Sequence, residues 1–267
     1  MFDEVYKIFS GNEEVKRPAK VLFWSEIGRA SVGLGAYFMS LPMLQLMPQG
    51  DNHPVLVIPG FMSTDRTTSP LRFYLKSRNY VPYRWQLGRN LANFYEIEEK
   101  VYERLLELKS KHGRKVSIVG WSLGGVYARE IARRHPDAVR QVITLGSPFG
   151  GITGDNNIEW LYELATGRKV TEVDHIPKDV LESIPKPTPV PTTAIYSKSD
   201  GVVAWQHCME KEEGPITENV EVFGSHIGLG HNPAVLACIA ERLSQPEEKW
   251  KRFNQTTFGK LFYSKYF

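Results

Sequence analysis

The fold is decided by the stretch VSIVGWSLGGVY at residues 116–127. A short apolar run leads into Ser122, and apolar residues at helical spacing follow it, so we expect a strand, a tight turn and a helix. Residues 120–124 match the pattern G-x-S-x-G, in which two glycines stand where side chains would collide in a strained turn. Such a turn leaves the Ser122 hydroxyl exposed at the end of the strand. Ordinary glycine-rich turns share the pattern, so its meaning depends on the rest of the chain.

Strand-like and helix-like segments alternate on both sides of this stretch. The apolar runs at residues 55–58, 141–145 and 193–196 have the composition of strands that are covered on both faces. Further strands are expected at 80–87 and 220–223. Between them, helical spacing of apolar residues predicts helices that begin near residues 69, 93, 123 and 233. The alternation predicts an α/β fold with a mostly parallel central sheet and helices on both faces.

Length and composition indicate one domain over residues 1–267, because the chain is 42% hydrophobic and long enough for a large core. We expect residues 1–50 to form an N-terminal helical extension, in which apolar spacing at positions 2–9 predicts a short amphipathic helix. The regular pattern lapses at 152–190, where we expect a small cap or lid insertion, with surface decoration as the alternative. The tail at 250–267 mixes aromatic and basic residues; packing on the domain is favoured over contact with an anionic membrane.

The segment Ala30 to Met47 carries no charged residue. Its length would allow a membrane span. Glycines, serines and Pro42 interrupt it, and we find no basic flank of the kind that accompanies a span. A buried helix is therefore the default expectation, and a peripheral contact with a lipid surface is the main alternative.

Charge and cysteine content limit the partners and the compartment. The net charge of +3 arises from 33 basic and 30 acidic residues, which disfavours nucleic acid as a partner. The segment Met1-Phe2-Asp3-Glu4 lacks the basic start and apolar core of a signal peptide, so we expect a cytoplasmic protein, with membrane association as an open addition. Cys208 and Cys238 form no metal pattern, and buried thiols are favoured over a disulfide. The sequence leaves the oligomeric state open.

An acid and a base follow two of the predicted strands. Asp200 lies in the turn after the strand at 193–196, on the rim of the sheet where Ser122 is expected. His226 lies directly after the last predicted strand. His231 follows five residues later at the entrance of a helix, so His226 is the preferred base. The chain order serine, aspartate, histidine is that of a Ser-Asp-His triad on a sheet of this kind.

With these residues placed, the chain resembles the α/β-hydrolase superfamily, and most of all its bacterial lipase and esterase branch. The resemblance covers Val55 to Leu243. One departure is that the usual His-Gly before the oxyanion residue is Pro59-Gly60 here, which leaves backbone donation possible. The motifs that carry the resemblance are Pro59-Gly60-Phe61, Gly120 to Gly125, Leu145-Gly146-Ser147-Pro148, Ser197 to Gly201, and Ser225 to Leu229.

The resemblance implies a serine hydrolase that cleaves carboxylic esters, with a small-molecule ester or a lipid as substrate. It implies Ser122 as nucleophile, His226 as general base and Asp200 as the group that orients the base. The backbone N–H groups of Phe61 and Leu123 would form the oxyanion hole. Such chemistry needs neither a metal nor an organic cofactor.

Several alternatives remain open at this stage. The same triad serves acyltransferases and thioesterases, which the residues do not separate from esterases. A non-catalytic binding module on the same fold is a further alternative. A haloalkane dehalogenase is disfavoured, because it would need a carboxylate where Ser122 stands.

Overall fold

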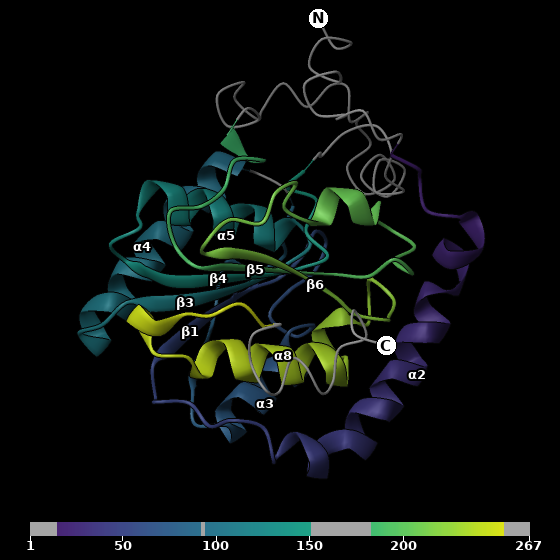
Figure 1. Ribbon diagram of the computed structural model, residues 1–267, viewed down its shortest axis with the longest axis horizontal. Helices are drawn as coiled ribbons and strands as arrows, with labels where there is room; N and C mark the ends of the chain where they lie inside the picture. The colour runs from purple at the N-terminus through teal and green to yellow at the C-terminus, as the bar shows by residue number, and fades with distance from the viewer. Residues whose placement is uncertain (1–14, 92–93, 151–182, 254–267) are drawn as a thin grey trace, which may run out of the picture.

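Six parallel strands form one sheet in the order β2-β1-β3-β4-β5-β6 (Figure 1). The computed structural model describes residues 15–91, 94–150 and 183–253. The strands are β1 (Pro54–Ile58), β2 (Val81–Arg84), β3 (Val116–Trp121), β4 (Val139–Leu145), β5 (Thr192–Tyr196) and β6 (Thr217–Glu221). Compared with the sequence prediction, β2 is shorter and β6 begins three residues earlier, at Thr217.

Burial explains which strands lie in the centre of the sheet. Every residue of β1, β3, β4 and β5 is buried, as their continuous apolar runs predict. The strand β2 is partly exposed and contains Pro82, which has no N–H for a ladder. Proline is tolerated there because β2 lies at the edge of the sheet.

Helices cover both faces of the sheet, which confirms the predicted fold class (Figure 1). On one face, α3 (Ser69–Ser77) and α8 (Pro233–Ser244) pack in one apolar core with side chains such as Val57 and Val119. On the other face, α4 (Phe94–His112) and α5 (Leu123–Arg134) enclose a second core around Leu56 and Ile118. The strand residues alternate between the two cores, as the period of two in a strand requires.

The helix α2 (Lys20–Leu44) corrects the expectation of a buried helix at residues 30–47. Only one narrow stripe of α2 is buried, formed by Glu26, Ala30, Tyr37 and Leu44. The physical reason is that α3 and α8 already cover this face of the sheet, so α2 packs at their side and leaves most of its surface exposed. Among the described residues, no helix is long and apolar enough to cross a membrane.

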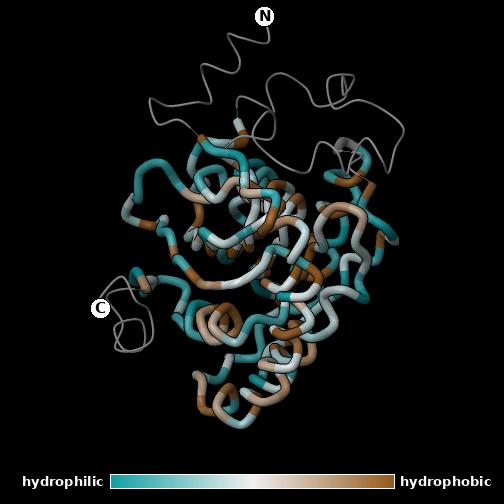
Figure 2. Tube along the Cα trace, turned by 90° about the vertical axis from the view of Figure 1, so that its right-hand side faces the viewer, coloured by the Kyte–Doolittle hydropathy of each residue, from teal (hydrophilic) through white to brown (hydrophobic). Residues whose placement is uncertain are grey.

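Many of the exposed side chains of α2 are large and apolar. Figure 1 shows α2 at the side of the molecule, and Figure 2, seen from that side, colours the chain by hydropathy. The large exposed side chains of α2 include Trp24, which is 75% exposed, and Met39, which is 84% exposed. We call the surface that they form the α2 apolar face; its large side chains are Val21, Trp24, Ile27, Val32, Leu34, Phe38, Met39 and Met43.

Some sequence predictions fall on residues outside the described ranges. These are the helix at positions 2–9, most of the cap at 152–190 and the end of the tail from residue 254. The two cysteines lie within the described residues, where Cys208 and Cys238 are both buried and neither is part of a disulfide.

Candidate functional site

The turn at Ser122 has the strained backbone that its glycine pattern predicts. Ser122 adopts φ 52° and ψ −124° between the end of β3 and the start of α5. A Cβ atom on Gly120 would lie 2.4 Å from the carbonyl oxygen of Gly124, and one on Gly124 would lie 2.4 Å from that of Ile58. Because neither backbone contact can yield, both positions require glycine for β3 and α5 to meet at this angle.

Asp200 and His226 form a buried pair beyond the ends of β5 and β6. The Nδ1 atom of His226 lies 2.6 Å from Oδ2 of Asp200. The other oxygen of Asp200 accepts hydrogen bonds of 2.8 Å from the backbone N–H groups of Val202 and Val203. The carboxylate is therefore held in one orientation, with one oxygen turned to the histidine.

Gly146 makes room for this pair at the end of β4. Its φ of 54° lies in the left-handed region, and an added Cβ would lie 3.1 Å from Nδ1 of His226 and 3.2 Å from Oδ2 of Asp200. The glycine in the motif Leu145-Gly146-Ser147-Pro148 thus has two functions: it forms the turn and it allows the pair to approach.

The electrostatics of His226 favour its protonated form. Burial by itself lowers the pKa of His226, because it disfavours the charged ring. The negative charge of Asp200, the hydrogen bond to Asp200 and the negative charge of Glu26 raise it. These effects prevail, so the pKa of His226 lies above its ordinary value.

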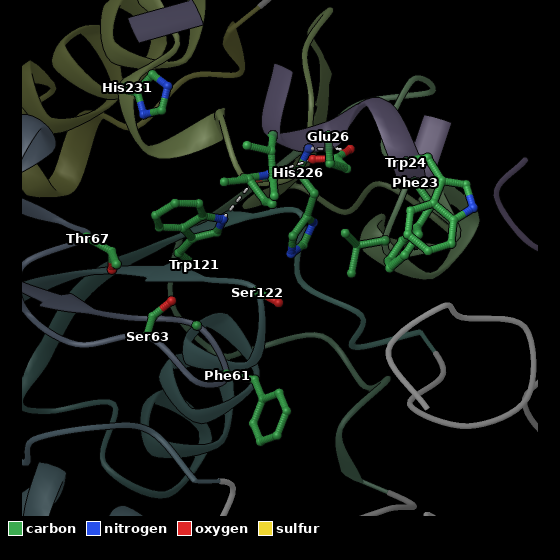
Figure 3. Close-up of a pocket in the computed structure, with 14 residues that line it drawn as sticks. Phe23, Trp24, Glu26, Phe61, Ser63, Thr67, Trp121, Ser122, His226 and His231 are labelled. Atoms are coloured by element: carbon green, nitrogen blue, oxygen red, sulfur yellow. Dashed lines mark hydrogen bonds between the residues drawn. The ribbon is translucent and has the colours of Figure 1, made fainter. Parts of the chain in front are cut away.

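Ser122 and His226 line the same pocket, and the histidine ring points toward the serine (Figure 3). The hydrogen bonds found among the described residues do not include a direct one between the Ser122 hydroxyl and His226. Such bonds are often long without substrate and shorten only when substrate binds. The arrangement therefore brings together the three residues that the sequence selected, with the serine and histidine facing each other.

The loop that carries Phe61 packs directly against the turn at Ser122. A Cβ on Gly60 would lie 3.0 Å from Cβ of Ser122, and Phe61 lines the pocket. Leu123 is the first residue of α5, so its backbone N–H belongs to the first helical turn, which has no partner within the helix. Both amide positions selected from the sequence thus adjoin Ser122.

Asn90 holds this loop in place, and sequence reasoning missed it. The buried Asn90 side chain donates a hydrogen bond of 3.0 Å to the carbonyl of Pro59. The backbone carbonyl of Asn90 accepts a hydrogen bond of 2.8 Å from the Met62 N–H, and its backbone N–H donates one of 3.0 Å to the Ser63 carbonyl. The turn sequence Gly88-Arg89-Asn90 predicted only a loop, because nothing local indicates a contact some thirty residues away.

The pocket above Ser122 has a volume of about 610 Å³ and mostly apolar walls. The helix α2 supplies part of the wall, which the sequence did not predict. Polar groups besides Ser122 and His226 are few, namely Glu26, Ser63, Thr67 and His231. The apolar wall is formed by Phe23, Trp24, Ile27, Phe61, Trp121, Val202 and Ile227.

The second histidine, His231, has a different environment from His226. Its Nε2 atom lies 2.9 Å from the carbonyl oxygen of Ala30 on α2. It therefore joins the wall of the pocket to α2, whereas His226 carries the contact with Asp200. In the described parts of the chain, no group of three or more His, Cys, Asp or Glu side chains could hold a metal ion.

Comparison with known proteins identifies one family and many solved structures with a similar fold. A model of the family described as palmitoyl protein thioesterase matches residues 54–199. No match to a curated protein was found.

Among solved structures, the chain is similar to lipase B of Aspergillus fumigatus, with a TM-score of 0.57 and 16% identity. The alignment covers 75% of this chain and 56% of that lipase. A lipase-esterase related protein from Clostridium acetobutylicum has a TM-score of 0.54 and 16% identity, with 73% of this chain and 97% of that chain covered. A mature lipase from Bacillus licheniformis has a TM-score of 0.53 and 15% identity, with 74% and 94% covered. At these identities the similarity concerns the fold.

Proposed function

Because this chain belongs to the palmitoyl protein thioesterase family, we propose that it hydrolyses an ester or thioester of an apolar acyl group through an acyl-enzyme on Ser122. The resemblance to the α/β-hydrolase superfamily is confirmed, and family and fold make the chain a hydrolase of the esterase, lipase and thioesterase kind. The observation that carries the proposal is the 2.6 Å contact between Asp200 and His226, whose ring lines the same pocket as the strained Ser122.

In the proposed acylation step, Oγ of Ser122 attacks the carbonyl carbon of the substrate. Its proton passes to Nε2 of His226, which is free to accept it when Nδ1 donates its hydrogen to Asp200. The tetrahedral intermediate then expels the alcohol or thiol, which takes the proton back from His226. The product of this step is an ester between the acyl group and Ser122.

Water completes the proposed cycle. His226 takes a proton from the water as it attacks the acyl-enzyme, and returns it to Oγ of Ser122 when the carboxylic acid leaves. In both steps the backbone N–H groups of Phe61 and Leu123 would donate to the oxyanion. The loss of one such donor costs about 3 kcal/mol of transition-state stabilisation in the enzyme where it has been measured.

The shape of the pocket supports an acyl group as the apolar part of the substrate. Its wall of Phe23, Ile27 and Trp121 offers few hydrogen-bond partners, which suits a hydrocarbon chain. The family description favours a thioester within this class. We therefore propose a fatty acyl thioester or ester as substrate, with the alcohol or thiol part outside the apolar wall.

Matched substrates test this function. Hydrolysis is measured for butanoyl and palmitoyl groups, each as a nitrophenyl ester and as a thioester, together with labelling by a serine-directed fluorophosphonate. We expect labelling at Ser122 and turnover that Ser122→Ala reduces by about 10⁴-fold or more. The matched control is Ser63→Ala, which removes another hydroxyl from the pocket wall and should retain labelling. A folded protein without labelling or turnover would favour the non-catalytic module.

We further propose that the α2 apolar face contacts a lipid surface. No charged residue occurs between Arg29 and Asp51, so the part of this face from Val32 to Met43 offers little to a polar partner. The exposed Lys16 and Lys20 precede it and suit anionic headgroups. Because Trp24 lies both on this face and in the pocket wall, the surface would adjoin the entry of an acyl substrate. This proposal refines the expected cytoplasmic location into one with peripheral membrane association.

Co-sedimentation with liposomes tests the surface contact. Binding to vesicles with anionic lipid should fall strongly for Phe38→Asp with Met39→Asp, because both side chains are highly exposed on α2. The control is Leu106→Asp, a 40% exposed leucine of α4 on the other face of the sheet. If the wild-type protein does not bind the vesicles, the proposed lipid contact is wrong. If the wild-type protein forms dimers that the α2 variants dissociate, the α2 apolar face binds a second copy of the chain instead.

We also propose that the chain is a single domain and that residues 152–190 form a cap over the site. Shortening residues 152–185 should change acyl-chain preference more than the rate on a short soluble ester, because the three site residues lie outside this segment. Equal loss on all chain lengths would indicate a structural segment instead.

A further inference from the structure

Glu26 of α2 joins the two loops that carry the acid and the base. It is 2% exposed, and its Oε1 atom accepts hydrogen bonds from the backbone N–H of Gly201, at 2.8 Å, and of His226, at 3.1 Å. Its Oε2 atom accepts one of 3.0 Å from Ile227. We propose that Glu26 is a positioning residue that holds Asp200 and His226 in their working arrangement. This inference rests on the proposed function of the pair.

The position of Glu26 relative to the site supports this role (Figure 3). Glu26 lies beside the backbone of His226, while the histidine ring points toward Ser122. The carboxylate therefore acts on the main chain of the base loop and leaves the ring free. Through Gly201 the same carboxylate contacts the residue directly after Asp200. One side chain thus sets the distance between two loops that come from different strands.

Arg29 strengthens this junction from the next turn of α2. Its Nη2 atom donates a hydrogen bond of 2.8 Å to Glu26, and its Nη1 atom donates one of 2.7 Å to the carbonyl of Ser199. The turn after β5 also packs on the backbone of α2, since a Cβ on Gly201 would lie 2.5 Å from the carbonyl oxygen of Leu22. The helix and the acid loop therefore form one rigid contact.

A carboxylate suits this position better than a neutral side chain. An ionised carboxylate only accepts, so both its oxygens can serve the three amide donors. A glutamine of the same shape would turn an NH₂ group toward at least one of those N–H groups, for example that of Ile227. Glu26→Gln therefore removes the negative charge and one acceptor while it keeps the volume of the side chain.

The charge of Glu26 also acts on the base. It raises the pKa of His226, as Asp200 does more strongly, whereas burial lowers it. A neutral residue at position 26 should therefore lower the pKa of His226. Among the described residues, Asp200 contacts this ring and the charge of Glu26 acts on it. His231 lines the same pocket, Arg29 contacts Glu26, and the Cys208 thiol lies under the influence of Asp200.

A second set of contacts between the same loops provides a matched control. The Ser199 hydroxyl donates a hydrogen bond of 3.0 Å to the carbonyl of Gly224, which lies two residues before His226. Ser199→Ala removes a link between the acid loop and the base loop without changing any charge. It should affect stability but leave the pKa of His226 in place.

The experiment measures kcat, KM and thermal stability of wild type, Glu26→Gln, Glu26→Asp and Ser199→Ala on a short soluble ester, together with an NMR titration of the His226 ring. For folded Glu26→Gln we expect kcat to fall about 10- to 100-fold with little change in KM, since small misplacement of a catalytic group has such effects. The acidic limb of the kcat/KM profile and the ring titration should both shift to lower pH. Glu26→Asp keeps the charge, so its titration should stay near that of wild type while kcat falls.

Three outcomes would overturn the proposal. One is a folded Glu26→Gln protein with wild-type kcat and titration. Another is a loss of kcat that follows thermal stability alone, with the same titration as in wild type. The third is the failure of both Glu26 variants to fold, which would make the carboxylate purely structural. The proposed function fails separately, through a wild-type protein that neither hydrolyses esters nor labels at Ser122, and the ring titration can be read even then.

Discussion

The indole N–H of Trp121 donates a hydrogen bond of 3.2 Å to the carbonyl oxygen of His226. Trp121 is the last residue of β3 and directly precedes Ser122, so this bond joins the turn at Ser122 to the loop that carries His226 across 105 positions of sequence. The distance between serine and histidine thus depends in part on the side chain in the variable position of the G-x-S-x-G pattern.

Replacing Trp121 by phenylalanine tests this link. Trp121→Phe keeps an aromatic ring but removes the donor, and we expect a loss of about 1 kcal/mol of stability. Because the bond helps to set the position of His226, kcat should also fall by up to about fivefold, the rate equivalent of that energy. Denaturant unfolding and steady-state kinetics measure the two effects. A variant that loses stability but keeps the full kcat would show that the bond has no part in positioning His226.

Gly146 offers a test of the space around the Asp200–His226 pair. In Gly146→Ala the new Cβ would lie closest to the Leu229 side chain and would also crowd Asp200 and His226, so kcat should fall well beyond any effect of reduced stability. The control is Gly113→Ala, which has a similar φ of 62° but nothing within 4 Å of the added Cβ. Both variants should lose about 1–2 kcal/mol from the left-handed backbone. If the two variants have the same kcat, crowding of the pair is not the cause.

The two histidines should differ in importance. His226→Ala removes the residue that contacts Asp200, so acylation should be almost abolished, as judged by the burst of nitrophenol and by fluorophosphonate labelling. His231→Ala removes the contact with the Ala30 carbonyl and should reduce the rate only modestly. Circular dichroism confirms that both proteins are folded. The reverse ranking would assign the base to His231.

The raised pKa of His226 predicts opposite trends of activity and stability with pH. The ring must be neutral to accept a proton, so kcat/KM should rise with pH through a pKa above that of an ordinary histidine. Stability behaves in the other direction: the contribution of the protonated ring is fully present below the unfolded pKa and is lost as pH rises through the folded pKa. Asp200→Asn should move the acidic limb to lower pH. A limb below the ordinary histidine range in wild type would contradict the assignment.

The sequence predicted the order and type of most elements, because their causes are local. Continuous β-branched and apolar runs predicted the four central strands, and helical spacing predicted α3, α4, α5 and α8. Asn232 and Pro233 begin α8 as expected, with the Asn232 side chain accepting from Ala234 N–H at 2.9 Å. The prediction of a buried helix at 30–47 was wrong. The charge-free composition of this segment predicted burial, whereas α2 exposes most of its apolar side chains.

By itself, the sequence determined the strained turn at Ser122, because the glycines that permit it stand two residues to either side. It also selected Asp200 and His226, since parallel strands place the turns after them on one rim of the sheet. Only the tertiary structure decided what supports these residues: Asn90 under the Phe61 loop, and α2 as a wall of the pocket. The contacts of Glu26 with Gly201 and His226 span 175 and 200 positions of sequence. No local pattern of residues encodes such contacts, because they arise only when the packed sheet brings the ends of distant strands against the same helix.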